Sequence, residues 1–240
     1  MHSGRMSWFE AVLLVLVLAV CSGLPTEPKV SAVLKGKVQD VYEELWLNNS
    51  DLARQTLAVP FLQHMQRGGL QADDYVAFML QDILYLLNVT DMLGRMSRRT
   101  LPDDLKTFMQ HRYQSYQSFS DYILDRFKLK APLDIRPIPA MERYLLDYRT
   151  IMDKEEPIFF AVSLLPCSRL WIWIASSLEE SYCNAYFVWK KGNMHGNPEK
   201  HYKVLLNKNL KTPDRIKRAN QIFRQQMQNE QNFFAASLVE

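Results

Sequence analysis

The feature that most constrains the fold of this chain is a pair of long segments in which apolar side chains recur every three or four residues. Residues 73–99 carry one such stripe, and residues 213–238 carry another. The interval matches the 3.6-residue turn of an α-helix, so each segment predicts a helix with one face in a core. Each stripe also holds one acid where an apolar residue is expected, Asp82 in the first and Glu230 in the second. These acids are candidate site residues, because a carboxylate withdrawn from water needs a partner.

The composition favours further helices over a sheet. The 240 residues include only eight glycines but 11 methionines, a poor supply of turn residues for a β-sandwich or barrel. No internal repeat or long linker divides the chain, which predicts a single all-α domain, a helical bundle. Periodicity places helices at 33–46, 50–66 with a break at Pro60, 73–99, 102–130, 140–152, 157–182 and 213–238, with loops at 132–139 and 193–198.

The first residues predict a secretory signal peptide. Ten apolar residues, 11–20, follow Arg5 and end at Cys21, Ser22 and Gly23, small residues of the kind that signal peptidase accepts. The run is too short to span a membrane comfortably, although an uncleaved anchor is the alternative. We expect a signal peptide of residues 1–23, a secreted domain of residues 24–240, and no membrane contact after cleavage.

Charge and motifs exclude several classes of function. The formal net charge of +3, from 29 basic and 26 acidic residues, is spread along the chain without a basic stripe. Nucleic acid is therefore not an expected partner. The sequence has no glycine-rich phosphate loop, no His-Glu-x-x-His and no Cys-x-x-Cys, and its five histidines form no metal-ligand pattern. We expect neither a metal nor a nucleotide cofactor.

Two cysteines remain after signal cleavage, Cys167 and Cys183. If one helix joined them, their Cα atoms would lie about 24 Å apart, well beyond the ~7 Å limit of a disulfide. Both thiols are therefore predicted to be free. Cys167 follows Pro166, which removes a helical hydrogen bond and leaves a more polar backbone that can favour a thiolate. Inert packing is the alternative for Cys167, and pairing with an arginine or capping of a helix is the alternative for the two acids.

Aromatic residues are dense around these three groups. Such rings either stack a flat heteroaromatic ligand or pack in the core, and both interpretations stay open from the pattern alone. The sequence also holds two glycosylation sequons, at Asn48 and at Asn88, the second inside a predicted helix. The aromatic residues near the acids and Cys167 are Tyr85, Trp171, Trp173, Phe187, Trp189, Phe233 and Phe234.

Three motifs resemble those of the TenA family, the thiaminase II proteins with a haem-oxygenase-like helical fold. They are Gln-Asp-Ile-Leu-Tyr-Leu at residues 81–86, Leu-Leu-Pro-Cys at 164–167 and Glu-Gln-Asn-Phe-Phe at 230–234. They occur in family order, on the three helices that carry Asp82, Cys167 and Glu230. The resemblance covers most of the mature chain. It implies a haem-oxygenase-like bundle, a small-molecule substrate, no cofactor and a possible homo-oligomer, since the family forms tetramers.

The resemblance also implies cleavage of thiamin or a related aminopyrimidine. It assigns Cys167 as the nucleophile that adds to the pyrimidine ring, and Glu230 as the acid and later base at the ring nitrogen. Asp82 would bind the amino-pyrimidine edge, and Tyr85 and Phe233 match ring-packing positions. The pyrimidine would pass to water in a hydrolase or to an organic base in a transferase. A secreted thiamin-binding protein without catalysis is the alternative, although binding a cation needs carboxylates and no thiol.

Four positions depart from the family pattern. Trp171 and Asn193 stand where the family commonly has tyrosines, and Val59 replaces the histidine of a His-Pro-Phe motif. Met141 stands at a third tyrosine position, where Tyr144 could substitute. We expect the lost hydroxyls to remove hydrogen bonds from the pocket without touching the nucleophile or the acids. Either the ligand or the acceptor of the pyrimidine group is then expected to differ from that of the family. Trp171 could stack an incoming aromatic base.

Overall fold

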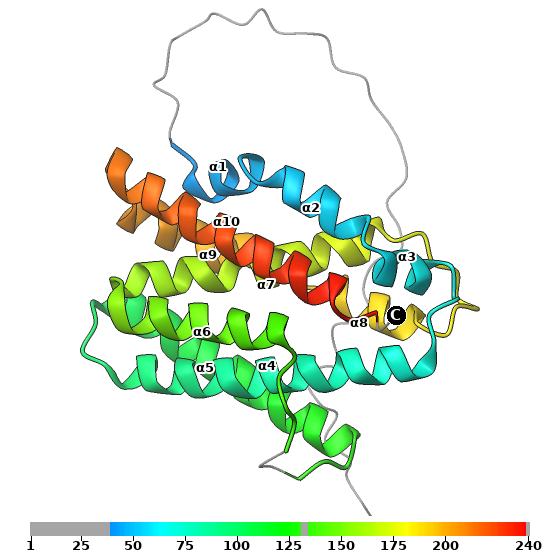
Figure 1. Cartoon of the computed structure of the whole chain (residues 1–240). Helices are drawn as coiled ribbons and strands as arrows, with labels where there is room; N and C mark the ends of the chain where they lie inside the picture. The colour runs from blue at the N-terminus through cyan, green and yellow to red at the C-terminus, as the bar shows by residue number, and fades with distance from the viewer. Residues whose placement is uncertain (1–38, 131–133, 239–240) are drawn as a thin grey trace, which may run out of the picture. The chain divides into compact units, whose positions relative to one another are not determined.

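The computed structural model describes residues 39–130 and 134–238, and every structural statement below concerns these residues. The predicted signal peptide and the start of the first predicted helix lie outside them. The predicted all-α helical bundle is confirmed, because the described residues form ten helices and no strand (Figure 1). The helices are α1 (Val41–Leu47), α2 (Ser50–Leu57), α3 (Pro60–Gln66), α4 (Ala72–Arg98), α5 (Asp103–Arg126), α6 (Pro139–Lys154), α7 (Pro157–Ser177), α8 (Phe187–Asn193), α9 (Pro198–Asn209) and α10 (Pro213–Ala235).

Proline sets the start of half of these helices. Its fixed φ suits the first helical turn, where its missing N–H has no intrahelical acceptor to lose. The predicted break at Pro60 is confirmed, since α2 ends at Leu57 and α3 begins at the proline. The helices that begin with proline are α3 at Pro60, α6 at Pro139, α7 at Pro157, α9 at Pro198 and α10 at Pro213.

The seventh helix is shorter than the sequence predicts. It ends at Ser177 instead of residue 182, because the backbone of Leu178 is extended and the N–H of Glu179 donates to the side-chain carbonyl of Gln66 over 3.1 Å. The assumption of one helix joining Cys167 to Cys183 is therefore wrong. Both thiols are nonetheless free, as predicted. Helices α8 and α9 are not among the predicted elements.

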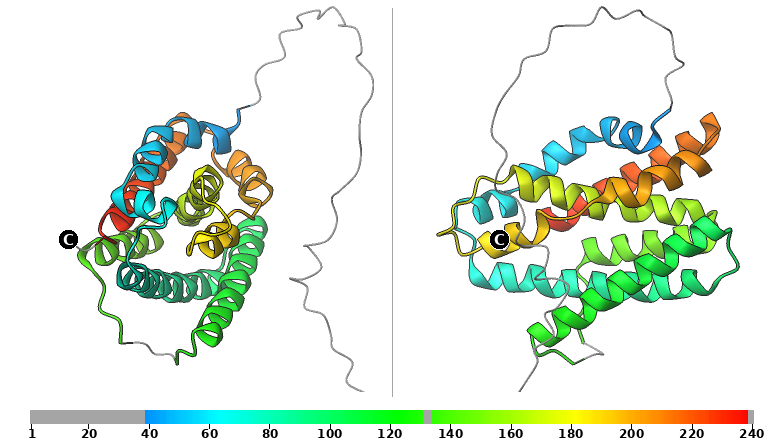
Figure 2. Two further views of the ribbon diagram at one scale, coloured as in Figure 1. Left: turned by 90° about the vertical axis from the view of Figure 1, so that its right-hand side faces the viewer. Right: turned by 180° about the vertical axis from the view of Figure 1, so that it is seen from behind.

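Helix α7 runs through the middle of the bundle, in contact with α2, α5, α6, α8, α9 and α10 (Figure 2). By length and composition alone, α4 and α7 could each cross a membrane. In the bundle, 72% of the apolar window of α7 is buried against other helices, as in the core helix of a folded domain. This central helix places Cys167 at the interior of the bundle.

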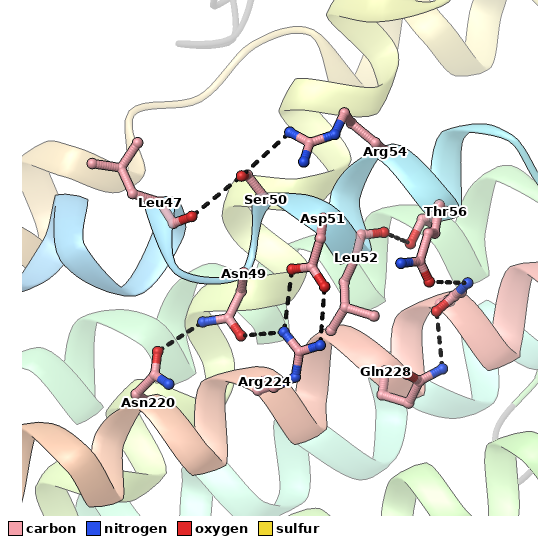
Figure 3. Close-up of polar contacts among 12 residues, drawn as sticks. Leu47, Asn49, Ser50, Asp51, Leu52, Arg54, Thr56, Asn220, Arg224 and Gln228 are labelled. Carbon is pink, nitrogen blue, oxygen red and sulfur yellow. Dashed lines mark hydrogen bonds and ion pairs between the residues drawn. The ribbon is translucent and has the colours of Figure 1, made fainter.

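Helix α10, which carries Glu230, is held against α2 by polar side chains (Figure 3). Asn49, fully buried, donates to Oδ1 of Asn220 over 2.8 Å and accepts a hydrogen bond from Arg224 over 3.2 Å. Arg224 also forms two hydrogen bonds with the Asp51 carboxylate, at 2.9 and 3.2 Å. These contacts hold the register of α10 relative to α2, and with it the position of Glu230.

Candidate active site

A cavity of about 790 Å³ is bounded by side chains from α4, α5, α7, α8 and α9. Its volume lies within the range of small-molecule binding sites. Four predicted site residues line it together, namely Asp82, Tyr85, Cys167 and Trp171. The other three, Tyr144, Glu230 and Phe233, are buried behind the wall and do not line it. The structure therefore brings one acid and the thiol to the cavity directly and places the second acid behind them.

Cys167 is half-buried and faces tyrosine hydroxyls. Burial, and next the negative charge of Glu230, raise the pKa of its thiol well above the ordinary value. The neighbouring hydroxyls of Tyr85 and Tyr116 oppose this rise in pKa. The thiol is thus protonated in the empty cavity, and a nearby base or a bound cation is needed to make it a thiolate.

Asp82 lies partly exposed in the cavity wall, without a hydrogen bond or ion pair to any other described residue. Burial raises the pKa of its carboxyl to about 7, and the charge of Glu230 adds to the rise. A free carboxyl with a pKa near neutrality can either accept a proton or pair with a cationic ligand.

Glu230 is 1% exposed and has both carboxylate oxygens occupied. The hydroxyl of Tyr144 donates to Oε1 over 2.6 Å, and the indole N–H of Trp171 donates to Oε2 over 3.0 Å. Burial raises the pKa of Glu230 to about 7, and these two hydrogen bonds counter part of the rise. Because Trp171 also lines the cavity, it connects the buried Glu230 carboxylate to the cavity.

A cluster of tyrosines connects Glu230 with Cys167. The hydroxyls of Tyr85 and Tyr148 lie 2.9 Å apart, and the rings of Tyr144 and Tyr148 stack at 5.2 Å. Tyr148 was not among the predicted site residues, although it follows Tyr144 by four positions and so shares its face of α6. Tyr116 was missed as well, since only the packing of α5 against the cavity shows its role.

Phe233 supports the cavity wall from behind. Its ring stacks on Phe78 at 5.1 Å, and Phe78 in turn stacks on Trp171 at 6.1 Å. The family-implied ring-packing role of Phe233 is therefore indirect in this arrangement, acting through Phe78 on Trp171.

The bundle is similar to solved structures of TenA proteins. A TenA homologue from P. horikoshii OT3 matches with a TM-score of 0.68 at 17% identity, over 83% of this chain and 98% of that one. A TenA family transcription regulator from Silicibacter sp. TM1040 matches with a TM-score of 0.71 at 13% identity, over 85% of this chain and 98% of that one. The chain has the TenA fold.

A third structure with the TenA fold, assigned as a TenA-like thiaminase from Sulfolobus solfataricus, matches with a TM-score of 0.63 at 16% identity. That match covers 82% of this chain and 94% of the other. No protein-family model matches the sequence, and no curated protein does. The resemblance drawn from the three motifs is thus confirmed as a shared fold.

Within the TenA fold, the predicted loss of hydrogen bonds at Trp171 is wrong. The indole N–H bonds Glu230, so tryptophan supplies a donor where the family commonly has a tyrosine. The Tyr144 hydroxyl also reaches Glu230, as expected if it substitutes for the tyrosine missing at the buried Met141. Asn193 lines the cavity and donates to the carbonyl of Trp189 over 2.9 Å.

Proposed function

We propose that this chain is a thiaminase-type enzyme, which cleaves thiamin or a related aminopyrimidine with Cys167 as the nucleophile. The observation that carries the proposal is the meeting of the Cys167 thiol and the unpaired Asp82 carboxyl in one cavity walled by aromatic rings. The TenA fold supports it further, since one neighbour of this fold is assigned as a thiaminase.

Binding follows from the charge and shape of the cavity. Asp82 is a hydrogen-bond acceptor and, when ionised, a partner for the exocyclic amine and ring of a protonated aminopyrimidine. Trp171 and Trp189 both line the cavity, with ring centroids 5.6 Å apart, and offer apolar faces to a flat ring. A bound cation would also counter the effects of burial and of the Glu230 charge, which together keep the pKa of the Cys167 thiol high.

In the first chemical step, a carboxylic acid protonates the pyrimidine nitrogen and the Cys167 thiol gives its proton to a carboxylate. The thiolate forms a sulfur–carbon bond to the ring, which loses its aromaticity. The carbon–nitrogen bond to the thiazolium then breaks, and the thiazole leaves with the electron pair. Asp82 suits this exchange, because it lines the cavity and its pKa near 7 lets it hold or release a proton at neutral pH. Glu230 has a similar pKa but lies behind the wall, so it would act through Tyr144 and Trp171, which both donate to it.

In the second step, water or an organic base adds to the exocyclic methylene. Water loses a proton to a carboxylate as it adds, whereas pyridine has no proton to lose and ends as a pyridinium product. In both cases the sulfur–carbon bond breaks and the ring regains aromaticity. Trp171 would stack an aromatic base at this stage, which favours transfer over hydrolysis.

A binding protein without catalysis is the second candidate, favoured by the raised pKa of Cys167, because a permanently protonated thiol is a poor nucleophile. Both candidates share the proposal that the protein is secreted, which rests on the apolar run at 11–20 and on the small residues after it. The family tetramer likewise remains a proposal for this chain, and light scattering of the mature protein would test it.

The experiment incubates residues 24–240 with thiamin, with and without pyridine, and separates the products by chromatography. Faster thiamin loss with pyridine and a pyridine-linked pyrimidine would support the transferase. A rate independent of pyridine, with the pyrimidine alcohol as product, would support the hydrolase. Thiamin binding without any product would support the binding protein and contradict the enzyme.

A further inference from the structure

The cavity continues beyond the thiol along α5. Arg112 and Arg126 both line it, and they are fourteen residues apart on one helix, or about 21 Å by the rise of 1.5 Å per residue. Asp82 and Cys167 line the same cavity, which is therefore longer than one pyrimidine ring needs.

The two ends of this cavity differ in chemistry. Toward Arg126 the lining is apolar and exposed, with Phe119 and Tyr122 stacked at 6.4 Å, and Arg126 itself donates to the Tyr122 hydroxyl over 3.2 Å. Toward Arg112 the lining is polar and comes from three helices. It consists of Arg112 from α5, Ser168 from α7, and His201 and Tyr202 from the first half of α9.

Arg112 carries an uncompensated charge at the polar end. Within the described residues its guanidinium forms no ion pair and no hydrogen bond, although the residue is partly buried. Burial, and next the charge of Arg112, lower the pKa of His201, and Lys200 adds to the effect. No carboxylate is among the charges that act on His201. An anion is the ligand that this local field favours.

Tyr202 is the second observation at the polar end of the cavity. Its side chain is fully buried, and its hydroxyl has no hydrogen-bond partner within the described residues. Burial raises the pKa of the phenol to about 12, and the charge of Arg112 and the Ser168 hydroxyl counter part of this rise. A buried hydroxyl without a partner costs free energy, and an acceptor oxygen in the cavity would satisfy it.

We propose that Arg112, Ser168, His201 and Tyr202 form an anion subsite that binds the phosphate of a phosphorylated substrate, so that thiamin phosphate is preferred to thiamin. This inference rests on the proposed function, because it assumes that the pyrimidine occupies the cavity at Asp82 and Cys167. Ser168 follows Cys167 in α7, so the subsite and the thiol line the same cavity, and the thiazole and its hydroxyethyl chain would separate the phosphate from the reacting ring. The guanidinium and hydroxyl donors match phosphate oxygens, which accept charge-assisted hydrogen bonds.

The test measures binding to the Cys167→Ser protein, so that no turnover intervenes. Tryptophan fluorescence and calorimetry give the Kd of thiamin and of thiamin monophosphate. We expect the phosphate to bind about tenfold more tightly or better, the scale of one hydrogen bond to a charged group. Adding Arg112→Gln should remove this preference and leave the Kd for thiamin within twofold. Tyr202→Phe, which deletes one hydroxyl and preserves the ring, should reduce the preference in the same direction.

The control is Lys217→Gln, which removes the same charge from an exposed residue of α10 outside the cavity and should keep the preference intact. Equal Kd values for the two ligands, or a preference that survives both Arg112→Gln and Tyr202→Phe, would overturn the subsite and leave the proposed function standing. If neither thiamin nor thiamin monophosphate binds, the proposed function fails. Inorganic pyrophosphate then decides the subsite, because binding that depends on Arg112 supports it and absence of binding overturns it.

Discussion

The indole N–H of Trp171 donates to Glu230 over 3.0 Å, while the same ring forms part of the cavity wall. Trp171 therefore contacts both the cavity and Glu230, although Glu230 itself does not line the cavity. Since this hydrogen bond lowers the pKa of Glu230, a change in the position of Trp171 on ligand binding would change the proton affinity of the acid.

Trp171→Phe isolates this hydrogen bond. The variant keeps an aromatic ring against Phe78 and Phe234 but removes the donor to Glu230. The pKa of Glu230 should rise further, and kcat should fall about tenfold or more, as expected for loss of a hydrogen bond to a charged group. The measurement is the pH profile of thiamin turnover. Trp171→Tyr, which offers a hydroxyl instead, should recover part of the activity. A Phe variant with wild-type kcat and pH profile would show that the hydrogen bond from Trp171 to Glu230 has no role in turnover.

Asp82 should make the protein less stable as pH rises. A carboxyl whose pKa is about 7 when folded and about 4 when unfolded binds more protons in the folded state between these values. The free energy of unfolding therefore falls as pH increases through this window. Asp82→Asn should weaken the dependence of Tm on pH, leaving the part that comes from Glu230, whose pKa is also raised to about 7. It should raise Tm at pH 8 by several degrees, at about 2–4 °C per kcal/mol for a chain of this size.

Asp51→Asn is the matched control for the pH experiment. The pKa of Asp51 is lowered by its hydrogen bonds with Arg224, so its ionised form stabilises the fold, and neutralising it should not raise Tm at high pH. Parallel Tm curves for wild type and Asp82→Asn would show that Asp82 is not held in a desolvated site.

The sequence located Asp82 and Glu230 because an acid on an apolar helix face is costly, and the structure buries Glu230 and leaves Asp82 partly exposed in the cavity wall. It could not show that Asp82 faces the cavity while Glu230 is enclosed. A stripe identifies the buried face of a helix but not what packs on that face. The same limit explains Tyr148, whose hydroxyl meets Tyr85 only through the packing of α6 on α4.

The sequence pattern also failed to predict short helices and the ends of helices that depend on loops. Helix α8 has seven residues, too few to show a stripe, and it nevertheless brings Trp189 and Asn193 to the cavity. The early end of α7 depends on a hydrogen bond from Glu179 to Gln66, which lies more than a hundred residues away in the sequence. Such non-local contacts leave no periodic signal.

Asn49→Ala should destabilise the fold. Asn49 is fully buried, and its loss leaves the side-chain oxygen of Asn220 and the carbonyl of Leu45 without their donor. We expect a cost of about 1–3 kcal/mol in urea unfolding with an unchanged m-value. The exposed pair of Asp51 and Arg224 should contribute at most about 1 kcal/mol, so Asp51→Asn should cost less. Equal costs would show that the buried amide adds nothing beyond the surface pair.

Expression through a secretory pathway should add one glycan, at Asn48. This residue is exposed at the end of α1. Asn88 lies within α4, donates to the carbonyl of Leu84 over 2.9 Å and accepts from Arg149 over 2.8 Å. Mass spectrometry before and after glycosidase treatment checks this. Modification at Asn88 would contradict the arrangement of α4 and α6, and the absence of any glycan would count against secretion.

The most direct test of the central claim follows the release of thiazole from thiamin by the mature protein and by two single-cysteine variants. Cys167→Ser should lower turnover by several orders of magnitude while preserving the helical circular dichroism spectrum and Tm, because serine is a close steric match. Cys183→Ser, at an exposed position away from the cavity, should keep nearly full activity. Intact mass spectrometry of quenched wild type should also reveal the pyrimidine bound to the protein, and that mass should be missing from Cys167→Ser. Equal turnover by the two variants, or turnover without a Cys167-dependent adduct, would contradict the assignment of Cys167 as the nucleophile.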